Sequence, residues 1–165
     1  MPAPTPAPSS SVKPEAVKPA SLTPAQCRPG TLAGELRVAV VRMVRRLRME
    51  RSSEDITDGQ YSVLAALSKN GPLTPGDLAD REHVRPPSMT RTVAHLEQAG
   101  LVARSDHPTD RRQVLVTITE QGEAEVRETR RRRDLWLSKQ LATLTVEERT
   151  TLAEATEILR RIATT

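Results

Sequence analysis

Apolar residues recur at intervals of three and four positions in the first regular stretch of the chain, which begins at residue 31 and runs to about residue 51. This interval is the period of an amphipathic helix, so the stretch predicts a helix with one apolar face. Such a face serves equally as ordinary core or as the surface that closes a dimer. Its members are Leu32, Leu36, Val40, Val44 and Leu47.

Local start signals predict three further helices in the middle of the chain. Thr57 and Gln60 have the spacing of a capping box, in which each side chain bonds the backbone N–H of the other. Thr74 is a second cap residue of the same kind. The Pro86-Pro87 pair is tolerated only in a first helical turn, where the missing N–H groups have no intrahelical partner. The three helices are expected to end at residues 70–72, near residue 82 and at Gly100.

The pattern then changes to that of a β-hairpin and returns to helices. Apolar and polar residues alternate over 113–118, after a short strand at 101–104, and the polar segment 106–112 joins the two. Thr119 opens a long helix that is expected to reach residue 144. A further capping box at Thr145 opens the last helix. Its apolar residues, at heptad-like spacing, are Leu152, Ala155, Leu159 and Ile162.

The short helix after Thr74 and the helix after Pro86, joined by a tight turn, form a predicted helix-turn-helix. In this motif the second helix lies in the major groove, and its N-terminal residues meet base edges. Residues 84–96 contain no acidic side chain, and the positive end of the helix dipole favours phosphate. Arg91 could also be only a solvated helix residue. The candidate groove residues are Thr74, Arg85, Ser88, Met89, Thr90, Arg91, Thr92 and His95.

We interpret the hairpin as a wing, because its loop carries Asp110, Arg111 and Arg112. An arginine at a hairpin tip can enter a narrow minor groove, where the potential is most negative. Asp110 would hold the guanidinium of Arg112 in a fixed pose. The alternative is a surface ion pair between these two residues, which contributes little on its own. The two roles are compatible.

Composition limits the remaining choices. Eight of the 13 prolines lie in the first 30 residues, so residues 1–30 bury too little surface to offset the entropy of ordering and are expected to form a disordered tail. With Trp136 and Tyr61 as the only aromatic residues, the chain is unsuited to stacking single-stranded bases. The net charge of +4 is too small to identify nucleic acid as the partner. The run Arg130–Arg133 points all around its helix, which favours a solvated face over long-range attraction of phosphate.

Several classes of function are disfavoured. The single cysteine, Cys27, allows no internal disulfide, and a redox role would need an electropositive niche that a proline-rich tail does not offer. No apolar run reaches the length of a membrane span and no secretory signal begins the chain, so we expect a cytoplasmic protein. Catalytic groupings and phosphate-binding glycine loops are missing, and the three histidines lack metal-ligand spacing. We therefore expect no enzymatic activity, cofactor or metal.

Residues 31–165 resemble the MarR family of transcription regulators. Three stretches carry the resemblance: Leu73–Ala79, Ser88–Val102 and Asp110–Gly122. The third is the most specific, because it joins the Asp-x-Arg of the wing to the following strand and helix start at the family's spacing.

The resemblance implies a fold and an assembly. The fold is mainly α: a winged helix-turn-helix, with a three-helix core and a β-hairpin wing, at residues 56–118. In this family the helices on either side, here 31–55 and 119–165, interlock with those of a second copy and form the dimerisation domain. The candidate dimerisation residues are Leu32, Leu36, Val40, Leu152, Leu159 and Ile162.

The resemblance also implies a site and a mode of regulation. Ser88, Thr90 and Arg91 fall at positions that the family uses in the major groove. Arg112 falls at the wing arginine that enters the minor groove, with Asp110 as its partner. Family members usually repress transcription and are often released by a small anionic or phenolic ligand, which sits between the dimerisation and DNA-binding parts.

The sequence therefore predicts a regulator that binds specific double-stranded DNA. It is expected to be a ligand-responsive repressor that acts as a homodimer on a pseudo-palindromic operator. The alternative is a winged-helix module that binds a protein partner, or that binds DNA without sequence preference. A steep salt dependence together with a footprint on one site would favour the specific regulator.

Overall fold

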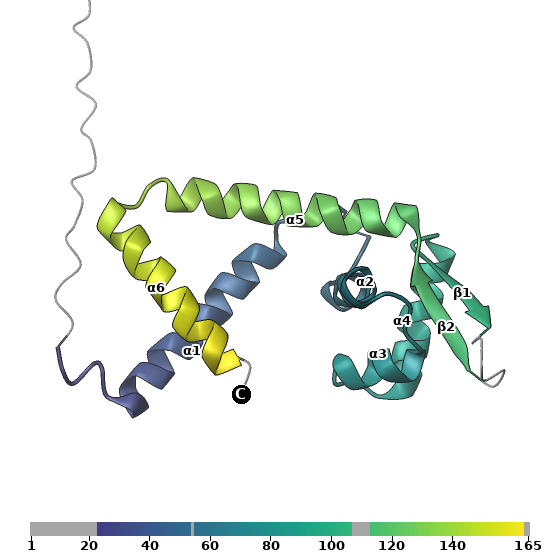
Figure 1. The fold of residues 1–165 in the computed structure, drawn as a ribbon, viewed down its shortest axis with the longest axis horizontal. Coiled ribbons are helices and arrows are strands. Elements are labelled where there is room, and N and C mark those ends of the chain that lie inside the picture. The colour runs from purple at the N-terminus through teal and green to yellow at the C-terminus, as the bar shows by residue number, and fades with distance from the viewer. Residues whose placement is uncertain (1–22, 54, 107–112, 164–165) are drawn as a thin grey trace, which may run out of the picture. The chain divides into compact units, whose positions relative to one another are not determined.

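The computed structural model describes residues 23–53, 55–106 and 113–163. These residues form six helices and a two-stranded antiparallel sheet (Figure 1). The chain divides into two compact units, residues 1–40 and 41–165, at a point inside the first helix. The elements are α1 (Pro29–Arg48), α2 (Asp58–Asn70), α3 (Pro75–Arg81), α4 (Pro86–Gln98), β1 (Val102–Asp106), β2 (Val114–Ile118), α5 (Glu120–Leu141) and α6 (Val146–Ala163).

Reciprocal capping boxes begin α2 and α3, as the sequence predicts. The Thr57 side chain accepts from the Gln60 N–H at 3.3 Å, and the Gln60 side chain accepts from the Thr57 N–H at 2.8 Å. Thr74 and Asp77 make the same pair of bonds at the start of α3. Each box satisfies two N–H groups that have no partner inside the helix, so these local signals fix where the helices begin.

The observed ends of some elements differ from the predicted ones. Pro29 and Gly30, which the sequence analysis assigned to the tail, are the first two residues of α1, and the first helical bond runs from the Leu32 N–H to the Arg28 carbonyl. A proline is well suited to this place because its missing N–H needs no partner there. The long helix α5 ends at Leu141, three residues before the predicted Leu144. Residues 1–22 of the predicted tail lie outside the described residues.

The core lies where α2, α3 and α4 pack together with the hairpin and the first half of α5. Strands β1 and β2 pair from Val102 opposite Ile118 to Asp106 opposite Val114, and a bridge adds Leu73 beside Val116. The buried apolar residues are Ile56, Val63, Leu64, Leu67, Leu78, Ala79, Met89, Val93, Leu96, Leu101, Val102, Val116 and Val126. The prediction of a mainly helical, winged helix-turn-helix fold is confirmed.

Two helices contribute no residue to this core. All the described residues of α1 and α6 are at least partly exposed in the single chain. Large apolar side chains are among them: Leu32, Val38, Val40, Val41, Met43 and Val44 on α1, and Val146, Leu152, Ile158, Leu159 and Ile162 on α6. These helices therefore lack partners that would cover their apolar residues within the described chain. Among the described residues, no helix combines the length and the apolar character needed to cross a lipid bilayer.

Candidate nucleic-acid interface

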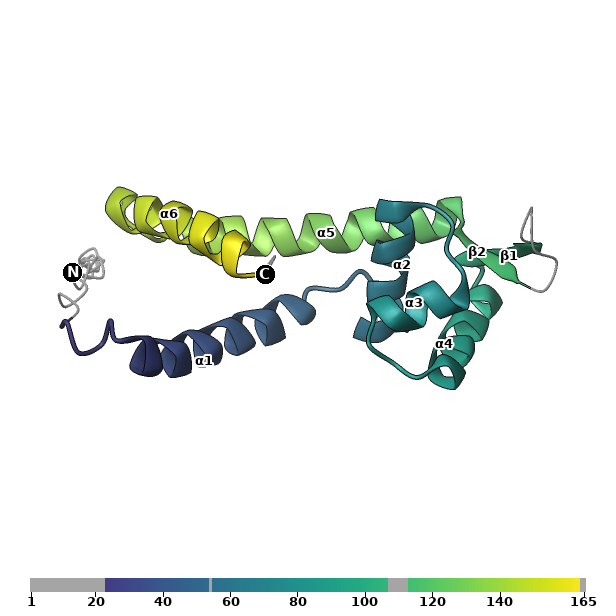
Figure 2. The same ribbon diagram turned by 60° about the horizontal axis from the view of Figure 1, so that its bottom comes forward.

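The helix-turn-helix is built from α3, a short connection and α4, which lie side by side next to the hairpin (Figure 2). The Val84 N–H donates to the Ala79 carbonyl at 3.0 Å and closes α3. His83 has a φ of 51°, a left-handed conformation that a residue with a side chain adopts only at some cost in energy. This turn directs the chain from the end of α3 into the first turn of α4.

Helix α4 separates its buried side chains from its polar ones. Met89, Val93 and Leu96 are packed into the core at the helical period. Met89 is only 2% exposed, so its prediction as a DNA-contacting residue is wrong: it belongs to the stripe that holds α4 in place. The predicted groove residues that remain on the surface of α4 or at its start are Arg85, Ser88, Thr90, Arg91 and His95, which are exposed, and Thr92, which is half-buried.

The first turn of α4 offers few backbone donors. Pro86 and Pro87 have no N–H, and the Ser88 N–H already donates to the Arg85 carbonyl at 2.9 Å. Helix starts usually bind anions through such N–H groups. Here the contact to phosphate must come from side chains, and Arg85 and Ser88 stand at this end of the helix.

The two threonines of α4 have already used their hydroxyl protons. Thr90 donates to the Pro86 carbonyl at 3.0 Å, and Thr92 donates to the Ser88 carbonyl at 3.1 Å. Each hydroxyl oxygen can still accept a bond, and each methyl group can contact a thymine methyl. The guanidinium groups of Arg85 and Arg91 are therefore the strongest candidate donors to guanine edges on this face.

Thr74 has the capping role that the sequence predicts. Its hydroxyl donates to Asp77 at 2.7 Å and accepts from the Asp77 N–H at 3.1 Å. The hydroxyl therefore caps α3, and a contact to DNA stays a prediction. Asp110, Arg111 and Arg112 lie outside the described residues, so their roles in the wing are also predictions.

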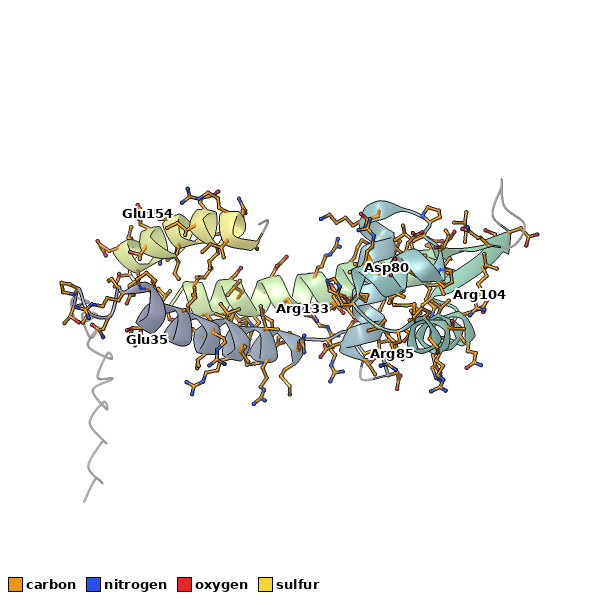
Figure 3. The ribbon with its side chains drawn as sticks, turned by 90° about the horizontal axis from the view of Figure 1, so that it is seen from below. Glu35, Asp80, Arg85, Arg104, Arg133 and Glu154 are labelled. Carbon is orange, nitrogen blue, oxygen red and sulfur yellow. The ribbon has the colours of Figure 1, made fainter. Side chains whose placement is uncertain are left out.

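Arg104 on β1 (Figure 3) makes a contact with α4 that the sequence analysis missed. Its Nε lies 3.2 Å from an oxygen of Glu97 near the end of α4. The pair links the wing to the recognition helix across the turn at Gly100. Opposite charges on either side of that turn are the only sequence signal of this contact, and they do not reveal how the strand will bend back.

The arginine run of α5 is divided among several contacts. Arg131 and Arg132 both bond Glu128, at 2.7 and 2.9 Å. The hydrogen bonds from Arg131 and then Arg132 lower the pKa of Glu128 to about 2, and the same contact raises the pKa of Arg131. Arg133 projects toward α2 and stacks on Tyr61, 4.3 Å from the ring centre (Figure 3). The other three arginines of the run are exposed, as expected of a solvated face, whereas Arg133 is half-buried.

Comparison with known proteins identifies the family. The model of the MarR family matches residues 56–114. A helix-turn-helix transcriptional regulator of Mycobacterium bovis, itself uncharacterised, is 46% identical over 128 residues, which are 78% of this chain and 90% of that protein. The chain belongs to the MarR family.

Other MarR-like proteins support the same assignment. The transcriptional repressor MdtR of Bacillus subtilis is 33% identical over 112 residues, 68% of this chain and 72% of that protein. The solved structure of a MarR family protein from Bacillus stearothermophilus is 26% identical and superposes with a TM-score of 0.71, over 82% of this chain and 95% of that one. The resemblance seen in the sequence is confirmed, and the protein is a DNA-binding transcriptional regulator of the MarR family rather than an enzyme.

Proposed function

We propose that this MarR-family protein is a repressor that reads a pseudo-palindromic duplex as a homodimer. The observation that carries the proposal is the division of α4, whose apolar side chains are buried while Arg85, Ser88 and Arg91 are exposed. In a helix-turn-helix the first turns of this helix meet the base edges of the major groove. The repressor named among the relatives supports repression as the outcome of binding.

A second copy of this chain is the proposed partner of α1 and α6. Exposed apolar surface of this extent is rare on monomers and marks a surface that another protein covers. Leu32, Val40, Leu152, Leu159 and Ile162 are exposed in the single chain, and Leu36 is half-buried. All six predicted dimerisation residues are therefore available to a partner. In the dimer, two recognition helices about 34 Å apart would enter successive major grooves.

A pocket in the second unit is the proposed effector site. It has a volume of about 330 Å³. It is lined by the C-terminal end of α1, by the first half of α2 and by one residue of α5. Two polar atoms buried at its lining residues, Asp58 Oδ1 and Arg133 Nε, have no hydrogen-bond partner. Arg48, which lies 3.7 Å from Asp58, and Arg133, which stacks on Tyr61, provide positive charge for an anionic or phenolic compound. The lining residues are Val44, Leu47, Arg48, Asp58, Tyr61, Ser62, Ala65 and Arg133.

A panel of benzoates and phenols tests the effector site. We expect at least one compound to raise the melting temperature and to weaken duplex binding by about 5- to 150-fold, the usual range of coupling between two sites. Arg133→Met should abolish both effects, whereas Arg130→Met, which removes an exposed arginine of the same helix, should leave both. A compound that stabilises the protein without weakening duplex binding would contradict the proposal.

Arg91→Ala tests the reading of DNA. We expect it to weaken binding to a duplex selected from a random pool by about 1–3 kcal/mol and to relax the preference at one base pair, because a forked contact to a base edge is lost. Arg130→Ala removes the same charge from α5 and should change binding little. Competition binding against point-mutated duplexes measures both effects. An equal loss on every duplex would favour binding without sequence preference, and no binding to any duplex would favour a protein partner.

A further inference from the structure

The connection between α1 and α2 is fastened to α5 by a group of polar side chains. Ser52 lies in this connection, and its backbone N–H donates to Thr129 Oγ1 at 3.2 Å. The two hydroxyl oxygens are 2.6 Å apart, and the Ser52 hydroxyl also donates to Glu125. These partners are more than 70 positions apart in the sequence, so the contact is tertiary.

The bonds form one consistent chain of donors and acceptors. Thr129 accepts from the Ser52 N–H and can donate to the Ser52 hydroxyl, which donates to the Glu125 carboxylate. Each hydroxyl thus donates once and accepts at least once, and the chain ends on a charged acceptor, which strengthens hydrogen bonds. Thr129 is 1% exposed, so water does not compete for its hydroxyl.

Thr129 differs from other helical threonines of the chain in the partner of its hydroxyl group. Thr90, Thr92, Thr150 and Thr156 donate to the carbonyl four residues earlier in their own helices. Thr129 is turned instead toward another segment. A buried hydroxyl that bonds across segments fixes one register between them, because any other register would leave it without a partner.

A second set of bonds supports the same segment. Arg132 Nη1 donates to the Arg51 carbonyl at 2.9 Å, and Arg51 Nη1 donates to the Ile56 carbonyl at 3.2 Å. Glu125, Thr129 and Arg132 follow one another at intervals of four and three, so they lie on one face of α5. Contacts from two turns of α5 therefore hold the connection before it enters α2.

We propose that Ser52 and Thr129 are positioning residues that set the spacing at which the protein reads its two half-sites. The inference rests on the proposed binding as a homodimer. The connection is the segment that joins α1 to the DNA-binding helices, and α5 joins the wing to α6. With the clamp of Ser52, Thr129 and Glu125 closed, the DNA-binding helices cannot pivot at the connection, so only one separation of the recognition helices fits.

The test measures binding to duplexes that contain both half-sites. The half-sites are separated either as in the duplex selected from a random pool or by one base pair more or fewer. For the wild type we expect a loss of about tenfold for either change, which is within the range of couplings between sites. For Ser52→Ala and Thr129→Val we expect a loss below about threefold, under that range. Ser53→Ala is the matched control, because Ser53 bonds Asp55 within the connection and should keep the strict spacing. Thr129→Ser retains the hydroxyl and should also keep it.

The ratio of affinities between spacings separates positioning from a general loss of stability. A variant that is merely less stable binds all spacings more weakly and leaves the ratio unchanged, and that result for both Ser52→Ala and Thr129→Val would overturn the inference. Equal affinity of the wild type for all three spacings would overturn the inference too. A wild type that is monomeric in sedimentation, or binds no duplex, would instead overturn the proposed function.

Discussion

Leu159→Glu is expected to convert the proposed dimer into monomers and to lower the affinity for the complete operator by about 100-fold or more. Leu159 lies on α6 and is 38% exposed in the single chain. Leu152 and Ile162 of the same helix are exposed as well. A carboxylate placed in a surface that must lose its water is strongly unfavourable unless it finds a cationic partner. Each monomer would then bind one half-site alone and lose the gain that comes from linking two sites.

Sedimentation velocity measures the state of assembly, and gel shift measures affinity for one and for two half-sites. Thr150→Glu is the matched control, because it adds the same charge nine residues earlier, two and a half helical turns away on the opposite face of α6. This control should stay dimeric. If Leu159→Glu remained a dimer with full operator affinity, α6 would have no place in the interface.

The sequence predicted the features of this protein that depend on neighbouring residues. The capping boxes at Thr57 and Thr74 could be recognised because both members of each box lie three positions apart. The apolar residues that α4 buries are also set by local spacing, because Met89, Val93 and Leu96 recur at the helical period. Met89 shows the limit of this approach: it was predicted to contact DNA from its place near the start of the helix, and its burial excludes that role.

Contacts between distant segments could not be predicted in this way. Ser52 and Thr129 are ordinary polar residues in the sequence, and their pairing depends on how α5 passes the connection. Arg133 belonged to a run whose members could not be told apart, yet it alone stacks on Tyr61. The partners are more than 70 positions apart in the sequence, so no helical or strand period relates them. Their roles can be recognised only from the packing of the helices.

Gly122→Ala is expected to destabilise the fold by about 3 kcal/mol, at the upper end of the usual range for overpacking a buried site. Gly122 is buried near the start of α5, where a Cβ atom would overlap the backbone carbonyl of Leu101 and lie 2.7 Å from Cγ1 of Ile118. The backbone cannot yield here, because the same Leu101 carbonyl accepts from the Thr119 N–H at 3.0 Å. Relief of the overlap would have to move α5 away from the base of the wing.

Chemical denaturation measures this effect, and Gly59→Ala provides its control. Gly59 lies in the first turn of α2, and a Cβ there would meet nothing within 4 Å. The same substitution should therefore stabilise the protein by about 0.5–1 kcal/mol, since alanine loses less backbone entropy than glycine in a helix. Opposite signs at these two positions are the expected result. A small, equal change at both would mean that α5 does not pack against Leu101 in solution, and the hairpin would then lack the support of α5.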